Sequence, residues 1–155
     1  MQGVEQLSKI WRLPLDTNNK DLRSIENFII KKYLGINYQY KGRSLAGLDC
    51  YGLIIRIYAD FGVELIDLQD EYDERWQWKR WAESIEQYYK KWEKVETPQL
   101  LDVVLFKKNN IVNHGGVALN NGRFIHCCKL GVIVSRLDEP MWRKRIEGFY
   151  RYGNC

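Results

Sequence analysis

The chain of 155 residues contains only two histidines and four cysteines, and each shortage limits the chemistry available to it. The cysteines, at positions 50, 127, 128 and 155, form no Cys-x-x-Cys pair and show no zinc-ligand spacing. Cys127 and Cys128 are neighbours, and neighbours on a strand point to opposite faces, so a disulfide between them is not expected. We therefore expect free thiols, a reducing environment and no metal site.

Long apolar runs are also missing. Residues 1–15 contain no basic stretch followed by an apolar one, so we expect no signal peptide and synthesis in the cytosol. No segment approaches the roughly 20 apolar residues of a membrane-spanning helix, which argues against a membrane partner. The net charge is +4, but Lys and Arg are spread along the chain, and the lack of a compact basic patch argues against nucleic acid.

The composition is sufficient for one globular domain over residues 1–155, because 45% of the residues are hydrophobic. Residues 1–20 are predicted to form an irregular extension. A helix with a periodic apolar face follows and ends at Gly35, and residues 36–49 are expected to be a loop. Aromatic residues then recur at helical spacing, which predicts an aromatic-rich helical insertion over residues 70–94. That helix would pack on the core, cover a cleft or bind a partner.

The second half of the chain is typical of antiparallel strands. They are expected at residues 103–106, 113–119, 123–128, 131–137 and around 146–152, with a short turn at 138–140. The Asn120-Asn121-Gly122 sequence is a strong hairpin signal between two of them. Helices followed by an antiparallel sheet predict an α+β fold.

The most informative stretch is Asp49-Cys50-Tyr51-Gly52. The apolar residues after it recur at helical spacing, at Leu53, Ile54, Ile57 and Phe61. Asp49 is a good N-cap for this helix, and Gly62 would end it. A thiol on the first turn lies at the positive end of the helix dipole, which favours the reactive thiolate. The alternative is a buried structural cysteine.

Both histidines fall in the predicted hairpin, on its two strands. If Leu119 pairs with Arg123, then His126 lies opposite Gly116, which shares a strand face with His114. The two imidazoles would be diagonal neighbours on one face, and a register slip of one residue would separate them. His114 could then take the proton of Cys50, and His126 could orient His114. Each histidine alone would more simply be structural.

Two glycines follow His114 and are expected to leave room for a substrate backbone. Metal binding by the two histidines and a cysteine fits no standard spacing. A serine-based triad has no support, because no serine lies in a comparable elbow. The pattern therefore favours a cysteine nucleophile.

These residues resemble the NlpC-like cell-wall peptidases, which are papain-related cysteine enzymes that cut peptidoglycan stem peptides. The resemblance extends over roughly residues 25–152 and rests on three segments, at 33–38, 47–53 and 114–126. It implies a papain-like fold with the nucleophile on a helix N-terminus packed against the sheet. It also implies that Cys50 is the nucleophile, His114 the base and His126 the orienting residue, with no cofactor.

Further site residues follow from the same resemblance. Tyr38 matches a tyrosine that lines the oxyanion site together with the Cys50 backbone N–H, and a phenol O–H is a suitable donor there. Asp49 matches a residue that contacts a substrate amine, although helix capping explains it equally well. Tyr51 stands where many members have a serine that binds a free N-terminal alanine, so we expect a narrowed or redirected pocket. Leu101-Asp102 replaces the usual Gly-Asp, which suggests a changed turn.

The resemblance implies hydrolysis of a peptide bond in peptidoglycan, most simply the D-γ-glutamyl-diamino-acid bond. Residues 142–152 and Tyr51 resemble the branch associated with phage tails and prophages, so phage tail proteins are expected partners and delivery with the virion tail is expected. One alternative is a non-catalytic tail assembly or scaffold protein that docks through residues 70–94. Another is an amidase or acyltransferase. A catalytic Cys50 should react with iodoacetamide well below pH ~8.5, and an inert one would favour the scaffold.

Overall fold

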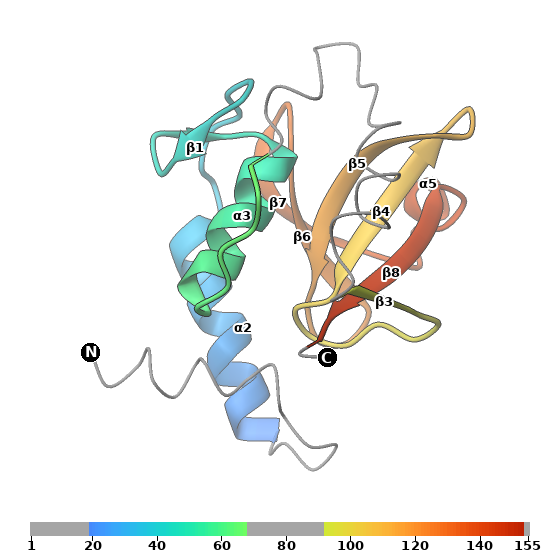
Figure 1. Cartoon of the computed structure of the whole chain (residues 1–155), viewed down its shortest axis with the longest axis horizontal. Coiled ribbons are helices and arrows are strands. Elements are labelled where there is room, and N and C mark those ends of the chain that lie inside the picture. Colours follow the sequence, from blue (N-terminus) through green and yellow to red (C-terminus); the bar gives the residue numbers. More distant parts are fainter. Residues whose placement is uncertain (1–18, 68–91, 154–155) are drawn as a thin grey trace.

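The computed structural model describes residues 19–67 and 92–153, and Figure 1 shows their arrangement. The helices are α2 (Asn19–Tyr33), α3 (Cys50–Asp60) and the short α5 (Pro140–Arg143). The strands are β1 (Arg43–Ser44), β2 (Gly47–Leu48), β3 (Trp92–Val95), β4 (Val103–Lys108), β5 (Ile111–Ala118), β6 (Arg123–Cys128), β7 (Gly131–Arg136) and β8 (Ile146–Tyr152). The two long helices precede the large sheet, which confirms the α+β class.

The helix that carries Cys50 begins and ends as predicted. Asp49 is the N-cap of α3, because its Oδ1 accepts a hydrogen bond of 2.7 Å from the Gly52 backbone N–H. Gly62, at φ +81°, follows the helix in the left-handed conformation that glycine adopts without strain. Leu53, Ile54 and Ile57 are buried, so the periodic face turns toward the core.

The main sheet has six strands in the order β3-β8-β4-β5-β6-β7, and every neighbouring pair is antiparallel. Its central hairpin has the predicted register. The Leu119 backbone N–H donates to Arg123 O at 2.8 Å, and Gly116 lies opposite His126. This register confirms the prediction, made from the Asn-Gly turn, of which residues on the two strands share a face.

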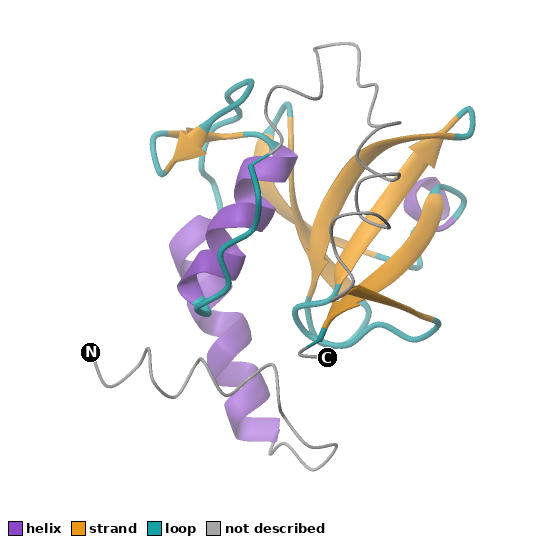
Figure 2. Ribbon diagram, viewed as in Figure 1, coloured by secondary structure: helices purple, strands orange, loops and turns teal. Residues whose placement is uncertain are grey.

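The sheet is covered on both faces, as Figure 2 shows. Val103 and Leu105 of β4 join the larger core beneath α2 and α3. The alternate residues Val104 and Phe106 join a smaller core on the other face, together with Trp142 of α5. Strand alternation therefore divides the apolar residues between two layers.

Three local predictions need correction. The helix expected over residues 70–94 does not include 92–94, which belong to β3; residues 70–91 lie outside the described ranges, as do 1–18. Trp92 pairs with Tyr152 of β8, and its ring lies 5.5 Å from that of Tyr58. Pairing with β8, which makes β3 the edge strand of the sheet, thus overrides the helical spacing at this end. The predicted loop at 36–49 contains the β1–β2 hairpin, and α5 follows directly on the expected turn at 138–140.

The turn before β4 keeps a glycine-like backbone although its sequence is Leu-Asp. Leu101 adopts φ +76°, a conformation that costs about 1–2 kcal/mol for a residue with a Cβ. The leucine side chain is buried, and a turn that differs from that of other members stays a prediction. In the part of the chain that is described, no helix is long and apolar enough to cross a membrane.

Candidate active site

The two histidines meet on one face of the β5–β6 hairpin. His114 Nε2 lies 2.7 Å from His126 Nδ1, and the ring planes are 79° apart. His126 is fully buried and His114 is 9% exposed. Trp142 stacks on His114 with ring centroids 5.5 Å apart, so the imidazole is held from two sides. The predicted diagonal contact is present.

A serine extends this contact and was missed from the sequence. Ser135 Oγ of β7 lies 2.8 Å from His126 Nε2. His126 is opposite Ile133 in the β6–β7 register, so Ser135 is its diagonal neighbour on the same face. The register of this second hairpin was the signal that could have identified it. The result is a row of three polar side chains, His114, His126 and Ser135.

Both imidazoles are neutral at pH 7. Burial lowers the pKa of His126 to about 4. It also lowers the pKa of His114 well below the ordinary value, with smaller effects of the same sign from His126 and Arg145. A neutral imidazole carries one N–H. Of the two consistent directions of hydrogen bonding along the row, one leaves the His114 Nδ1 lone pair free: His114 donates to His126, and His126 donates to Ser135.

Cys50 approaches the sheet from the opposite layer. The backbone N–H of Gly115, one residue beyond His114, faces the Cys50 thiol closely enough to oppose the rise of its pKa. The thiol is 1% exposed and belongs to the larger core. Among the described residues no hydrogen bond joins this sulfur to an imidazole. The structure therefore brings Cys50 beside His114, but it assembles only the histidine pair.

The charge state of Cys50 differs from the expectation. Burial raises the pKa of its thiol above the ordinary value, and the negative charge of Asp49 adds to this; the Gly115 and Tyr51 N–H groups act in the opposite direction. Desolvation of a thiolate therefore outweighs the helix-terminus effect. The expected thiolate is thus corrected to a neutral thiol in this conformation.

The glycines after His114 do not leave room for a substrate backbone. A Cβ on Gly115 would lie 3.2 Å from the Ile54 side chain of α3. A Cβ on Gly116 would lie 2.7 Å from Ile125 O and 3.0 Å from His126 Cβ. Gly115 thus lets α3 approach β5, and Gly116 makes room for the Cβ of His126 and the ring of Phe124.

A pocket of about 200 Å³ opens beside His114. Its walls are formed by Tyr38, Asn113, His114, Cys127, Cys128, Lys129, Trp142 and Arg145. At this place β5 and β6 are not paired with each other, because their pairing runs only from Gly116 to Ala118 on β5. Tyr38, the predicted oxyanion residue, lines the same pocket as His114.

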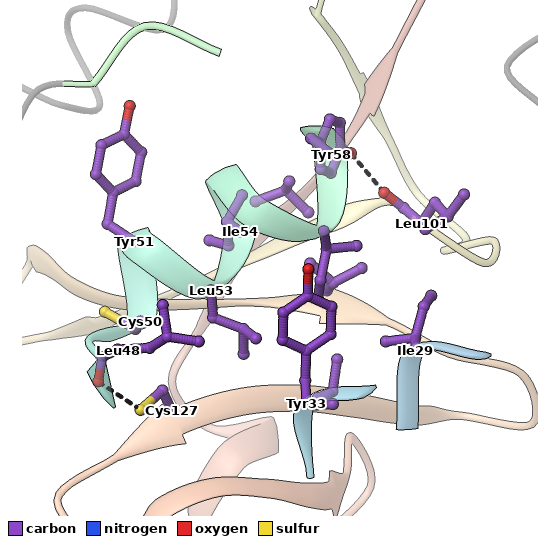
Figure 3. Packing of buried hydrophobic residues seen from close by; sticks show 14 of the residues in the cluster. Ile29, Tyr33, Leu48, Cys50, Tyr51, Leu53, Ile54, Tyr58, Leu101 and Cys127 are labelled. Carbon is purple, nitrogen blue, oxygen red and sulfur yellow. Dashed lines mark hydrogen bonds between the residues drawn. The ribbon is translucent and has the colours of Figure 1, made fainter. Parts of the chain in front are cut away.

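Asp49 and Tyr51 are placed away from this pocket. Both oxygens of Asp49 are occupied, by the N–H groups of Gly52 and Lys41 and by the Arg43 guanidinium. Asp49 is fully buried, which fits the capping role. Tyr51 is 2% exposed and its hydroxyl donates to the Ile66 carbonyl. Figure 3 shows its ring pointing away from Cys50 and Cys127. Contact of either residue with substrate stays a prediction.

The thiols at 127 and 128 are free. Cys127 donates to Leu48 O at 3.0 Å, which ties β6 to the residue two positions before Cys50 (Figure 3). Burial raises the pKa of Cys127 to about 12. Within residues 19–67 and 92–153, no three His, Cys, Asp or Glu side chains are grouped so as to hold a metal ion.

Comparison with known proteins gives relatives in both sequence and structure. Over 113 residues the chain is 30% identical to murein DD-endopeptidase MepS/murein LD-carboxypeptidase of Escherichia coli K12, covering 72% of this chain and 53% of that protein. It is 27% identical over 151 residues to gamma-DL-glutamyl hydrolase of Bacillus subtilis 168, covering 92% of this chain and 32% of that protein. The chain thus spans at most about half the length of these relatives.

A solved structure shows the same fold. A Staphylococcus aureus protein of the NLP/P60 family, similar to a lipoprotein, superposes with a TM-score of 0.63 at 20% identity, covering 92% of this chain and 44% of that chain. Residues 35–151, which include the Cys50 helix and the histidine hairpin, match the NlpC/P60 family. The chain therefore belongs to the NlpC/P60 family.

Proposed function

We propose that this protein is a cysteine peptidase that hydrolyses a peptide bond in the stem peptides of bacterial peptidoglycan. The observation that carries the proposal is the 2.7 Å contact between His114 Nε2 and His126 Nδ1, beside the helix N-terminus that bears Cys50. A buried pair of neutral histidines backed by Ser135 costs free energy to maintain, and base catalysis explains why it is there. The murein endopeptidase among its relatives supports the choice of substrate.

In the proposed reaction His114 is the general base. The Cys50 thiol turns from Gly115 N–H toward His114 Nδ1 and gives up its proton as the sulfur attacks the scissile carbonyl carbon. Catalytic hydrogen bonds commonly tighten only when substrate is bound, so the resting geometry is compatible with this step. The imidazolium that forms is stabilised by His126, whose Nδ1 accepts from His114 Nε2–H.

The remaining steps return every group to its starting state. Collapse of the tetrahedral intermediate breaks the C–N bond, and His114 gives its proton to the leaving amine. Water then loses a proton to His114, attacks the thioester, and releases the acid and the Cys50 thiol. Tyr38 lies on the pocket wall with His114, where its hydroxyl can donate to the oxyanion. The reaction consumes one water and needs no cofactor.

We further propose that the bond cut is the D-γ-glutamyl-diamino-acid bond. The gamma-DL-glutamyl hydrolase among the relatives supports this choice, since that name describes the same kind of acyl group. The chemistry is also consistent: an amide made through the γ-carboxyl lacks bulky substituents next to its carbonyl. Such a chain can enter a pocket of about 200 Å³ more easily than a branched residue.

The test is digestion of purified muropeptides and of a synthetic L-alanyl-γ-D-glutamyl-diamino-acid peptide, with new amines identified by mass spectrometry. We expect the wild type to release the diamino acid and Cys50→Ala to release none. Thermal unfolding of Cys50→Ala shows whether the variant is folded. If folded wild type releases no new amine from any wall chemotype, the peptidase proposal is wrong.

A second candidate is a non-catalytic member that keeps the fold as a scaffold. The observation in its favour is the 1% exposure of Cys50 together with its raised thiol pKa. Slow iodoacetamide labelling of the resting protein no longer separates the two candidates, because burial makes it the expectation for both. Trapping the acyl-enzyme separates them. Mass spectrometry of a reaction mixture quenched with acid should show an acyl group on Cys50 for the peptidase and none for the scaffold.

We also propose that a phage tail delivers the protein to the wall. Residues 142–152 and Tyr51 resemble the tail-associated branch of the family, and this resemblance is what supports the assignment. Proteomics of virions from a lysogen that encodes the chain is the direct measurement. Absence of the chain from purified tails would reject this delivery route and leave the peptidase proposal untouched.

A further inference from the structure

Two cations line the pocket beside His114, and none of the described residues that form its walls carries a carboxylate. Lys129 and Arg145 are the charged residues among those that form the walls. Lys129 is exposed, and Arg145 is half-buried. A pocket with this lining has a positive potential that attracts an anionic group.

The Arg145 side chain is held in a fixed position. Its Nη2 donates to Asn113 Oδ1 at 2.9 Å, and its Nε donates to Lys107 O at 3.3 Å. The guanidinium carbon lies 5.3 Å from the ring centre of Trp142. These contacts use one face of the guanidinium and two of its nitrogens. No acceptor in the described ranges takes the Nη1 hydrogens. The guanidinium is therefore positioned in advance, with donors to spare.

Three other half-buried arginines have an ion-pair partner that Arg145 lacks, while Arg56, on α3 outside the pocket, also has none among the described residues. Arg43, Arg123 and Arg151 each contact a carboxylate at 2.7–3.0 Å. Arg145 and Lys129 have no such partner within residues 19–67 and 92–153. Desolvating an arginine without a counter-charge is costly, which indicates that an external anion completes the site.

The unpaired cation lies close to the proposed base. Trp142 is in contact with both, because its ring stacks on His114 and lies under Arg145. After burial and His126, Arg145 is the third cause that lowers the pKa of His114, so its charge reaches the imidazole. A ligand group bound by Arg145 would therefore lie on the Trp142 ring that also contacts the proposed base.

We propose that Arg145, assisted by Lys129, binds a carboxylate of the substrate and makes the enzyme specific for acidic stem peptides. The inference rests on the proposed peptidase function and names the substrate group that this pocket selects. Arg145 provides a paired donor fork for the two carboxylate oxygens, and Lys129 adds a mobile charge at the rim. Asn113 and Trp142 act as positioning residues for Arg145.

The chemistry of a γ-glutamyl bond supplies such a group. Because the amide uses the γ-carboxyl, the α-carboxyl remains free, three carbons from the scissile carbonyl. The diamino acid on the amine side carries a second free carboxylate. Both sources offer the same ligand to Arg145, so the experiment has to separate them.

The experiment compares three peptides: L-alanyl-γ-D-glutamyl-diamino acid, its glutamyl α-amide and its diamino-acid amide. We expect wild type to prefer the acid over one of the amides by about 10- to 100-fold in kcat/KM, as for a lost charged hydrogen bond. Arg145→Gln should reduce this preference to about one, while Arg145→Lys should keep part of it. The amide that loses activity identifies the carboxylate.

The matched control is Arg143→Gln, which removes the same charge from an exposed side chain on α5 outside the pocket. It should keep the wild-type preference, and Lys129→Gln should lose a smaller part than Arg145→Gln because it is exposed. Thermal unfolding of each variant excludes a folding defect. Equal acid-to-amide ratios in wild type and Arg145→Gln would overturn the carboxylate site while the peptidase function stands.

Binding measurements keep the two proposals separate. Calorimetry with Cys50→Ala reports affinity for the three peptides without turnover. The carboxylate site is supported if Cys50→Ala binds the acid more tightly than the amides and the Cys50→Ala/Arg145→Gln double variant does not. This holds even if wild type cleaves nothing. Equal affinity for acid and amides in Cys50→Ala overturns it.

Discussion

At the scale of single residues, the site is a row of neutral polar groups rather than a resting ion pair. Burial lowers the pKa of His114 and His126 and raises that of Cys50, so all three are uncharged at pH 7. In the proposed reaction, charge would then develop only when proton transfer and attack on the substrate coincide. In such an arrangement the direction of each hydrogen bond decides which nitrogen is basic.

Ser135 should set that direction. In Ser135→Ala the His126 Nε2–H loses its acceptor, so the tautomer that leaves His114 Nδ1 free is less favoured. We expect kcat to fall about 3- to 10-fold with KM nearly unchanged, the value of one hydrogen bond. Ser135→Thr, which keeps the hydroxyl, should restore most of the rate. Imidazole nitrogen shifts in NMR report the tautomer directly.

Ser24→Ala is the matched control, since its hydroxyl donates only to Lys20 O on the exposed side of α2. It should leave the rate and the imidazole spectrum unchanged. Wild-type kinetics and unchanged nitrogen shifts in Ser135→Ala would show that the Ser135 contact does not position His126.

At the scale of elements, two adjacent glycines in β5 determine how the layers meet. Gly115 faces α3 and Gly116 faces His126 Cβ and the Phe124 ring, because strand residues alternate between faces. Cys50 of α3 therefore lies on one face of β5, and the histidines lie on the other. The two layers meet at the Gly115 peptide. The Gly115 peptide is therefore where the layer of Cys50, the proposed nucleophile, approaches the strand of His114, the proposed base.

Gly116→Ala should separate the histidine pair while leaving the hairpin formed. The new Cβ would lie 2.7 Å from Ile125 O and 3.0 Å from His126 Cβ, and backbone cannot give way as a side chain end can. We expect a loss of about 1–3 kcal/mol in the free energy of unfolding, as for other overpacked sites. Activity should fall by more than this stability loss explains, measured at a temperature where the variant is folded.

Gly122→Asn provides the control in the same hairpin. Gly122 has φ +71° with nothing within 4 Å of its Cβ position, and asparagine tolerates this conformation. Its activity should match wild type. Full activity of Gly116→Ala would mean that the His114–His126 distance does not matter.

At the scale of the whole molecule, ion pairs connect segments that are distant in sequence. Arg123 of β6 contacts Glu26 of α2 at 2.7 Å, and Arg151 of β8 contacts Asp102 beside β4 at 2.8 Å. Both carboxylates are nearly buried, so removing either partner would leave an uncompensated charge. Helix layer and sheet are thereby connected by polar as well as apolar contacts.

The buried histidines should make the protein less stable in mild acid. His126 has a folded pKa of about 4, below its unfolded value, so the unfolded state binds more protons between these two values. Stability is therefore complete above pH ~6.5 and falls as the pH drops toward 4, by about 2 kcal/mol at pH 5 from His126 alone. Urea unfolding at pH 8 and pH 5 measures the loss.

His126→Asn removes this titration but keeps a polar side chain. Its difference in unfolding free energy between pH 8 and pH 5 should be smaller than that of the wild type by about the same 2 kcal/mol. Equal pH dependence in the two proteins would show that His126 is not held neutral by burial.

The sequence by itself determined a large part of this protein. The N-cap and apolar spacing predicted α3 with Cys50 on its first turn, and the Asn-Gly turn predicted the hairpin register that pairs the histidines. These features are local: a cap, a period and a two-strand register depend on residues close in the chain. Family membership rests on the same segments.

Tertiary structure decided what depends on burial and on distant neighbours. Ser135, Trp142 and Arg145 reach the histidines through the β6–β7 register and the α5 turn, which no local pattern displays. Burial of Cys50 and contact with Gly115 set the charge of its thiol, against the expectation from the helix terminus alone. Desolvation is a property of the whole packed molecule, so the charges at this site follow from the fold rather than from spacing in the sequence.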